Sequence, residues 1–193
     1  MNGPNDTPKP DARITGATLT FGEWRARPML ESDADLAFTF LNDPGVTAAR
    51  TRLPPQDFAG ALAWVNDALS DAACVPWILE SANDAGSAGF IALQSFDPTT
   101  GVAEIGFLVM PSARRKGLAT KALRAVTEWA FATLDIHRVY LVHDTSNEGS
   151  CKAAVSAGYA IEGTCRSSRP RPDGTRADSE LHARLRTDGE TTA

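Results

Sequence analysis

The sequence predicts one mixed α/β (α+β) domain in which a mostly antiparallel central sheet is flanked by about four helices. The first observation is length, because 193 residues suffice for one domain with a substantial core and no covalent staples. The second is periodicity, since short strand-like apolar runs are interspersed with segments whose apolar residues recur every three or four positions. The third is their order: three strand-like segments in a row predict an antiparallel meander, and a later strand–helix–strand run predicts a parallel pair.

The first elements follow from local signals near the start of the domain. Weak alternation of apolar and polar residues predicts a strand or short hairpin over residues 18–28. Ser32 and Asp35 have the spacing of a capping box, which predicts a helix over residues 33–41. A second stretch with helical period predicts another helix over residues 57–69.

The later elements alternate between strands and helices. Further strands are expected over residues 75–80, 88–96, 102–110, 138–142, 159–166 and 177–186. Further helices are expected over residues 117–134 and 147–157. The polar ends predict a disordered tail over residues 1–16, a single folded domain over residues 17–187 and a C-terminal tail over residues 188–193.

Composition argues against several classes of protein. No run approaches the roughly 18 apolar residues of a membrane span, and the polar N-terminus lacks the apolar segment of a signal peptide. Three cysteines without C-x-x-C spacing argue against a disulfide framework or a zinc site and fit a reducing cytoplasm. A net charge of −5 argues against a broad basic surface that binds nucleic acid. We therefore expect a cytoplasmic protein with no direct contact to membrane or nucleic acid.

The most informative segment is a basic, glycine-containing loop between a strand and the clearest helix. The start of a helix presents free backbone N–H groups, where a phosphate can dock. Gly117 keeps a Cβ away from an approaching anion, and Ala119 keeps the next inward position small. Arg114, Arg115 and Lys116 add positive charge. The segment predicts a polyphosphate site, although the Walker and dinucleotide patterns are absent.

The pattern Arg114-x-x-Gly117-x-Ala119 resembles the pyrophosphate loop of the GNAT (Gcn5-related N-acetyltransferase) superfamily, which binds acetyl-coenzyme A. Residues 137–150 resemble the strand and the Asn-x-x-Ser helix start of its RimJ/RimL-like branch of ribosomal-protein N-acetyltransferases. The resemblance covers roughly residues 18–187 and implies a GNAT-like fold. It also implies an enzyme that transfers the acetyl group of acetyl-CoA to a primary amine by direct attack in a ternary complex, without a metal.

The resemblance implies roles for particular side chains. The cofactor-binding residues that it implies are Phe107, Leu108, Val109, Arg114, Arg115, Lys116, Gly117, Leu118, Ala119, Thr120 and Asn147. Glu104 is the candidate base, acting through water, and His143 is the alternative. Ser150 is the candidate for protonating the leaving thiolate and Tyr159 is second, while Asn147 hydrogen-bonds pantetheine or positions the acceptor.

Each catalytic candidate also has a plainer interpretation. Glu104 is equally well a solvated strand residue, and His143 a structural or exposed histidine. Ser150 suits a helix start in any case, and Tyr159 suits core packing. Cys151 fits a small hydrophobe on a helix face better than a nucleophile.

The acceptor end is expected in two segments, residues 43–57 and 167–176. This end is net positive unless its arginines are merely solvated, because the two segments contribute more arginines than aspartates: Arg50, Arg52, Arg169, Arg171 and Arg176 against Asp43, Asp57 and Asp173. A positive end favours an acidic peptide N-terminus or an anionic amino metabolite and disfavours a polycationic aminoglycoside. Three alternatives stay open: a non-catalytic acyl-CoA-binding or regulatory module, an antibiotic-type small-molecule acetyltransferase, and a nucleotide-binding protein unrelated to CoA. Relatives of this kind often dimerise, so a homodimer is also expected.

Overall fold

The structure is a computed structural model, and it describes residues 14–47, 53–83, 86–171 and 174–189. Its strands are β1 (Leu19–Phe21), β2 (Trp24–Pro28), β3 (Val75–Ser81), β4 (Ser87–Asp97), β5 (Val102–Val109), β6 (Arg138–Asp144), β7 (Ala160–Pro170) and β8 (Arg176–Leu185). Its α-helices are α1 (Ala34–Leu41), α2 (Pro44–Thr47), α3 (Phe58–Ser70), α4 (Leu118–Thr133) and α5 (Glu148–Ser156). Short 3₁₀ turns are η1 (Glu31–Asp33), η2 (Pro111–Ala113) and η3 (Arg186–Gly189).

One eight-stranded sheet has the order β1-β2-β3-β4-β5-β6-β8-β7. Its neighbouring strands are antiparallel except for β5 and β6, which are parallel because α4 carries the chain back between them. The mixed, mostly antiparallel sheet expected from the sequence is confirmed. Within the described residues no helix is both long and apolar enough to cross a membrane.

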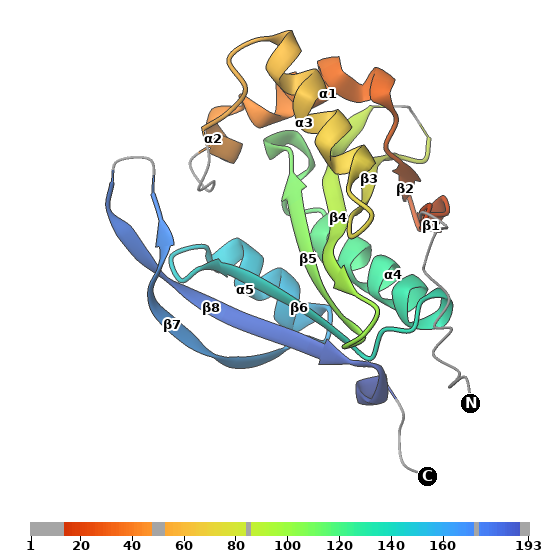
Figure 1. Cartoon of the computed structure of the whole chain (residues 1–193), viewed down its shortest axis with the longest axis vertical. Coiled ribbons are helices and arrows are strands. Elements are labelled where there is room, and N and C mark those ends of the chain that lie inside the picture. Colours follow the sequence, from red (N-terminus) through yellow and green to blue (C-terminus); the bar gives the residue numbers. More distant parts are fainter. Residues whose placement is uncertain (1–13, 48–52, 84–85, 172–173, 190–193) are drawn as a thin grey trace, which may run out of the picture.

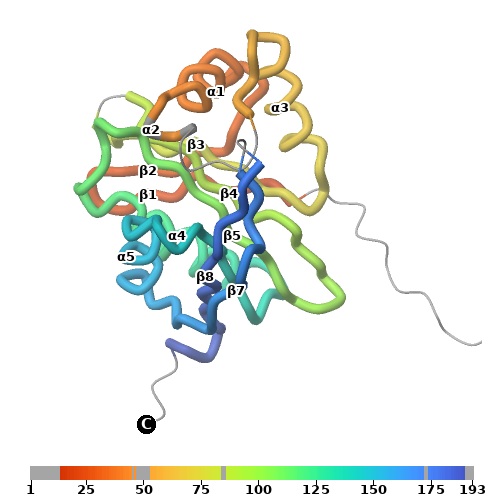
Figure 2. The backbone as a smooth tube through the Cα atoms, turned by 90° about the vertical axis from the view of Figure 1, so that its left-hand side faces the viewer, coloured from red at the N-terminus to blue at the C-terminus, as the bar shows by residue number. Residues whose placement is uncertain are grey.

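Helices cover both faces of the sheet, with α1 and α3 on one side and α4 and α5 on the other (Figures 1 and 2). Alternation along the strands explains the two layers, because successive side chains point to opposite faces. Trp77 of β3 joins the core with α4, and its neighbour Ile78 joins the core with α1 and α3. On β5, Ala103 and Ile105 face α4, while Leu108 packs against the α1 and α3 side.

The parallel pairing of β5 with β6 is short. It joins Val102 to Arg138, Ala103 to Val139 and Glu104 to Tyr140. Beyond Glu104 the two strands have no further paired residues, although both continue, β5 to Val109 and β6 to Asp144. The sheet is therefore split between its fifth and sixth strands, and Glu104 stands at the fork.

Most element boundaries agree with the sequence to within a few residues, and two local expectations are wrong. Ser32 does not cap the first helix. The 3₁₀ turn η1 precedes α1, and the Asp33 carboxylate accepts from the Leu30 amide at 2.8 Å. The strand expected to end at residue 166 continues to Pro170, because it pairs with β8 as far as Arg176. Ile14 packs against the core just ahead of the expected domain start.

A buried ion pair closes the start of the domain. Asp33 accepts from Arg27 Nη1 at 2.8 Å and from Arg27 Nη2 at 2.6 Å. Burial acts to raise the pKa of Asp33, but hydrogen bonds from Arg27 and Leu30 outweigh it and hold that pKa below its ordinary value. The carboxylate therefore stabilises the fold at neutral pH, and this contribution is lost as the pH falls below about 4.

We expect Asp33→Asn to lower the free energy of unfolding by about 2 kcal/mol at pH 7, because two charge-assisted hydrogen bonds weaken. Urea unfolding at pH 7 and pH 3 measures the effect. The wild type should lose more stability between these pH values than the variant. The exposed Asp35→Asn is the matched control. An equal pH dependence in wild type and Asp33→Asn would contradict this assignment.

Candidate functional site

A cavity of about 1150 Å³ occupies the split in the sheet. Its walls come from Glu104–Val109 of β5, Leu141–Asp144 of β6, the loop before α4 and the first turns of α5. A volume of this order suits a cofactor-sized ligand. Its position follows from the sheet, because the ends of β5 and β6 beyond Glu104 are not paired with each other and both line the space.

The loop before α4 is held in the shape of an anion cradle. Arg114 donates through Nε to the carbonyl of Val109 at 3.0 Å, which ties the loop to the end of β5. Gly117 caps α4 with φ +73°, a left-handed conformation that favours glycine. The opening amides of α4 lie beyond the reach of the helix's own carbonyls. These amides therefore lie where the sequence analysis expects an anion to bind.

Most of the expected cofactor residues line this cavity. The lining includes Phe107, Leu108, Val109, Arg114, Arg115, Gly117, Leu118, Ala119, Thr120 and Asn147. Lys116 does not lie with them. It lines a separate, smaller hollow beside Glu23 and Trp24.

The start of α5 forms the opposite wall. Asn147 caps the helix, because its Oδ1 accepts from the Ser150 amide at 3.1 Å. This bond uses the side-chain oxygen of Asn147 and leaves its NH₂ group to donate to a ligand. Asn147 and Ser150 both line the cavity. Ser150 is thus both a helix-start residue and a cavity residue, so its two interpretations are compatible.

The two candidate bases lie on opposite faces of the sheet. Glu104 alternates with Ala103 and Ile105, which face α4, so its side chain points to the α1 and α3 side. Tyr140 donates to Glu104 Oε2 at 3.5 Å, and burial followed by the Glu104 charge raises the pKa of Tyr140. His143 lies two residues after Leu141 on β6, so its side chain is on the same face as Leu141 and points to α5.

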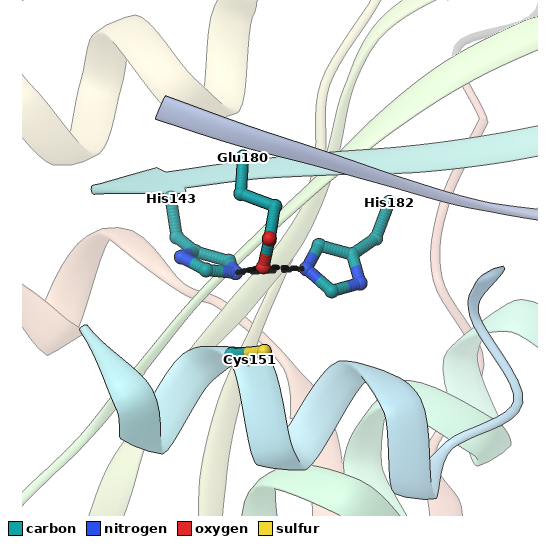
Figure 3. Close-up of side chains that lie close together, drawn as sticks. All are labelled: His143, Cys151, Glu180 and His182. Carbon is teal, nitrogen blue, oxygen red and sulfur yellow. Dashed lines mark hydrogen bonds and ion pairs between the residues drawn. The ribbon is translucent and has the colours of Figure 1, made fainter. Parts of the chain in front are cut away.

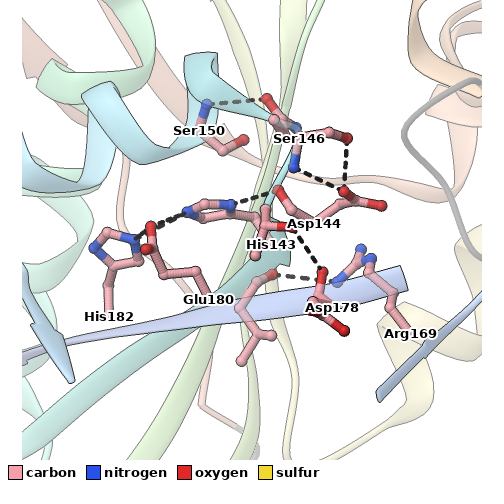
Figure 4. A network of polar contacts seen from close by, with 11 residues as sticks. His143, Asp144, Ser146, Ser150, Arg169, Asp178, Glu180 and His182 are labelled. Atoms are coloured by element: carbon pink, nitrogen blue, oxygen red, sulfur yellow. Dashed lines mark hydrogen bonds and ion pairs between the residues drawn. The ribbon is translucent and has the colours of Figure 1, made fainter. Parts of the chain in front are cut away.

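Both ring nitrogens of His143 have partners (Figure 4). Nδ1 is 2.9 Å from the carbonyl oxygen of Asp144, which makes Nδ1 the protonated nitrogen. Nε2 is 2.9 Å from Nε2 of His182. Neither nitrogen is directed to the α1 and α3 side, where Glu104 lies.

Tyr159 lies outside the cavity lining. It is 2% exposed, and its hydroxyl shares a hydrogen bond with Thr127 of α4. Burial raises the pKa of Tyr159, so the phenol stays neutral. This geometry agrees with the core-packing interpretation of Tyr159.

The expected acceptor arginines are only partly described. Arg50 and Arg52 lie outside the described residues. Arg169 lines the cavity and donates to the Val142 carbonyl at 3.4 Å. Its neighbour Arg171 donates to Asp144 Oδ2 at 2.7 Å.

Asp144 is fully engaged at this end of the cavity. Ser146 donates to its Oδ1 through both the amide and the hydroxyl, at 2.9 and 2.6 Å. The hydrogen bond from the Ser146 hydroxyl, and then the one from Arg171, lower the pKa of Asp144 well below its ordinary value. Asp144 is therefore an ionised carboxylate that Arg171 already pairs, and it is not an open cation site.

Comparison with known proteins agrees with this geometry. Residues 25–160 match the acetyltransferase (GNAT) domain family, which is well over half of the chain. The chain belongs to the GNAT acetyltransferase family. The GNAT fold and family expected from the sequence are thereby confirmed.

Three similar proteins illustrate how far the likeness of this GNAT domain reaches. Spermidine N(1)-acetyltransferase of Escherichia coli K12 is 29% identical over 80 residues, 42% of this chain and 43% of that protein. YdaF of Bacillus subtilis, described as a ribosomal N-acetyltransferase, is 31% identical over 83 residues, 43% of this chain and 45% of that protein. Each match therefore spans less than half of the relative's length.

The third is a solved structure. Spermidine N-acetyltransferase of Vibrio cholerae, in complex with CoA and spermine, superposes with a TM-score of 0.78 at 18% identity. The superposition covers 87% of this chain and 98% of that one. At this identity the likeness establishes the GNAT fold.

Several cavity residues of this GNAT domain were not foreseen. Gln94 lines the cavity from β4, and Ser146 lies at its polar end, beside Arg171 of the expected acceptor segment. Trp64 of α3 and Phe90 of β4 supply an apolar wall and pack edge to face with centroids 5.2 Å apart.

Proposed function

We propose that this chain transfers the acetyl group of acetyl-CoA to a primary amine by direct attack in a ternary complex. The observation that carries the proposal is the split between β5 and β6, with the free amides of α4 at one end and Glu104 at the fork. Such a split lets a thioester reach one face of the sheet while an amine approaches from the other.

The bound co-substrate would run from the loop into the split. The α4 amides of Leu118, Ala119 and Thr120 would hold the pyrophosphate, with Arg114 and Arg115 adding charge. Gly117 provides no side-chain cap, so no capping side chain competes with the ligand for these amides.

The arm of the co-substrate would pair with the open edge of β5. Residues 107–109 have no partner on the β6 side, so this edge can pair with an added strand-like ligand, apart from the Val109 carbonyl, which accepts from Arg114. The amide of Val109 is paired with neither β6 nor α4 and would polarise the thioester carbonyl. Asn147 on the opposite wall would hold the arm through its NH₂ group.

The acceptor must lose a proton before it attacks. An alkyl amine has a pKa of about 10 and is mostly protonated at pH 7. We favour Glu104 as the base, acting through water, because it faces the α1 and α3 side where the acceptor segments lie. His143 fits the role less well, since its nitrogens are taken up by Asp144 and His182.

Ser150 would hydrogen-bond or protonate the leaving thiolate from the first turn of α5. We expect Ser150→Ala to lower kcat about tenfold and to leave the KM for acetyl-CoA nearly unchanged, because the thiolate develops only in the transition state. Steady-state thiol release measures both constants. Ser70→Ala, at the exposed end of α3 and outside the cavity lining, is the control. A raised KM with normal kcat would assign Ser150 to ground-state binding instead.

The acceptor is proposed to carry negative charge close to its amine. Arg169 lines the cavity, while Asp144, an acidic side chain of the same lining, is already bound to Arg171 and Ser146. An acidic peptide N-terminus or an anionic amino metabolite fits this charge distribution. The spermidine acetyltransferase relatives favour a second candidate, a polyamine, for which Glu104 is the remaining carboxylate at the fork.

A panel of acceptors at fixed acetyl-CoA tests the proposal. We expect thiol release with a peptide that has an acidic N-terminal sequence to exceed release with spermidine at least tenfold in kcat/KM. Arg169→Ala should lower kcat/KM for the peptide and not for a neutral amine. The reverse order would overturn the anionic acceptor while leaving acetyl transfer in place.

The activity itself has a separate test. Calorimetry should detect binding of CoA, and ATP should not displace it. Binding without thiol release across the whole panel would favour a non-catalytic module, and no binding would contradict the proposal. The RimJ/RimL-like branch is proposed on the sequence motifs and the YdaF match. A homodimer and a cytoplasmic location also remain expectations.

A further inference from the structure

Four potential metal ligands meet on the α5 side of the sheet, beside the proposed active site (Figure 3). They are His143 of β6, Cys151 of α5, and Glu180 and His182 of β8. One donor atom from each lies within 4.8 Å of all the others. Three separate elements therefore aim two imidazoles, a thiol and a carboxylate at one point.

Strand register explains the convergence. On the adjacent strands β6 and β8, His143 pairs with Glu180 and Leu141 pairs with His182. The three ligands from these strands therefore stand on one face of the sheet. The first turn of α5 lies over this face and brings Cys151 down onto it (Figure 3). The two histidines are nearly inaccessible, at 5% and 0% exposure.

The donor atoms are already close to coordination spacing. Nε2 of His143 lies 2.9 Å from Nε2 of His182, and Glu180 Oε2 lies 3.0 Å from the latter and 3.6 Å from the former. Cys151 is hydrogen-bonded to Glu180. In a tetrahedral site with bonds of about 2.0–2.3 Å, ligand atoms are roughly 3.3–3.7 Å apart. Adjustments of about an ångström or less would form such a site.

The second contact of His143 orients it for a metal. Its Nδ1–H donates to the Asp144 carbonyl at 2.9 Å, which fixes the tautomer and leaves the Nε2 lone pair directed at the cluster. Metal-binding histidines commonly donate their other N–H to a carbonyl in this way.

We propose that His143, Cys151, Glu180 and His182 bind one Zn²⁺ ion. A Cys-His₂-carboxylate set suits zinc rather than the oxygen-seeking Mg²⁺ or Ca²⁺. One thiolate and one carboxylate also balance the charge of the ion, which matters at a buried point. Zinc would fasten the first turn of α5, which carries Ser150, to β6 and β8.

This site does not follow from the cysteine spacing in the sequence. Cys151 has no neighbouring cysteine, and the other ligands lie 8 residues before it and 29 and 31 residues after it. Only the pairing of β6 with β8, and the placement of α5 over them, brings the four together. The inference is independent of the proposed activity, because its test needs neither acetyl-CoA nor an amine.

Cobalt and zinc titrations of the chelator-treated protein test the site. Co²⁺ should give the intense visible bands of a tetrahedral site and a thiolate charge-transfer band in the near ultraviolet. One equivalent of Zn²⁺ should abolish both, and zinc should raise the melting temperature. Cys151→Ser should remove the charge-transfer band, whereas Cys165→Ser, on an exposed cysteine, should keep it.

A second variant separates loss of a ligand from loss of fold. Glu180 is partly exposed, and glutamine is close to it in shape, so Glu180→Gln should keep the circular dichroism of the wild type. The variant should nevertheless bind zinc at least tenfold more weakly. Absence of a cobalt charge-transfer band in the wild-type protein would overturn the proposal. Zinc affinity unchanged in both Cys151→Ser and Glu180→Gln would overturn it as well.

Discussion

Glu104→Gln should lower kcat for acetyl transfer about 10²–10³-fold, the range expected when a positioned general base is removed. The amide retains the shape of Glu104 and can still accept from Tyr140, but it cannot take a proton from the acceptor through water. Binding of CoA should be unaffected, because the proposed phosphate cradle is at the start of α4 and Glu104 is at the fork between β5 and β6. Initial rates of thiol release and calorimetry with CoA measure the two properties separately.

The pH dependence sharpens this prediction. If Glu104 assists deprotonation, the variant should recover part of its rate as the pH approaches the pKa of the acceptor amine, where free amine is abundant. Glu148→Gln, an exposed carboxylate on α5, is the matched control and should keep the wild-type rate. Wild-type kcat in Glu104→Gln together with a large loss in His143→Gln would reverse our choice of base.

Local signals in the sequence were sufficient for most of the fold. Periodicity located the strands and helices, and the strand–helix–strand order predicted the parallel pair of β5 and β6. The failures are places where tertiary pairing decided the outcome. β7 runs past residue 166 because β8 offers it a partner, and the chain enters α1 through η1 because Asp33 is bound to Arg27.

The candidate site divides in the same way. The loop at Gly117 could be picked out as a candidate phosphate site because such a site depends on consecutive backbone amides and one glycine, which are local in the sequence. The sequence could not decide between Glu104 and His143 as the base, because that choice depends on which face of the sheet each occupies and on partners such as His182. Contacts between residues far apart in sequence leave no local pattern.

Gly89→Ala should cost at least about 3 kcal/mol of unfolding free energy, the largest stability effect that we expect from adding one methyl group. Gly89 adopts φ +153°, and a Cβ there would lie 2.1 Å from the carbonyl oxygen of Leu108. That oxygen belongs to the backbone of β5, where Leu108 directly precedes Val109, the residue that pairs with Gly89. The strands would have to separate, which weakens backbone hydrogen bonds worth about 1 kcal/mol each.

Gly163→Ala is the matched control for this variant. Gly163 has nearly the same conformation, φ +157°, but nothing lies within 4 Å of its added Cβ. Its substitution should carry only the conformational cost, about 1–2 kcal/mol. Urea unfolding of both variants isolates the contribution of the close contact between β4 and β5.

Because that contact shapes the β5 edge proposed to hold the thioester, Gly89→Ala should also weaken CoA binding at temperatures where it remains folded, and Gly163→Ala should not. Equal losses of stability in the two variants would mean that the backbone conformation, and not the approach of Leu108, determines the need for glycine.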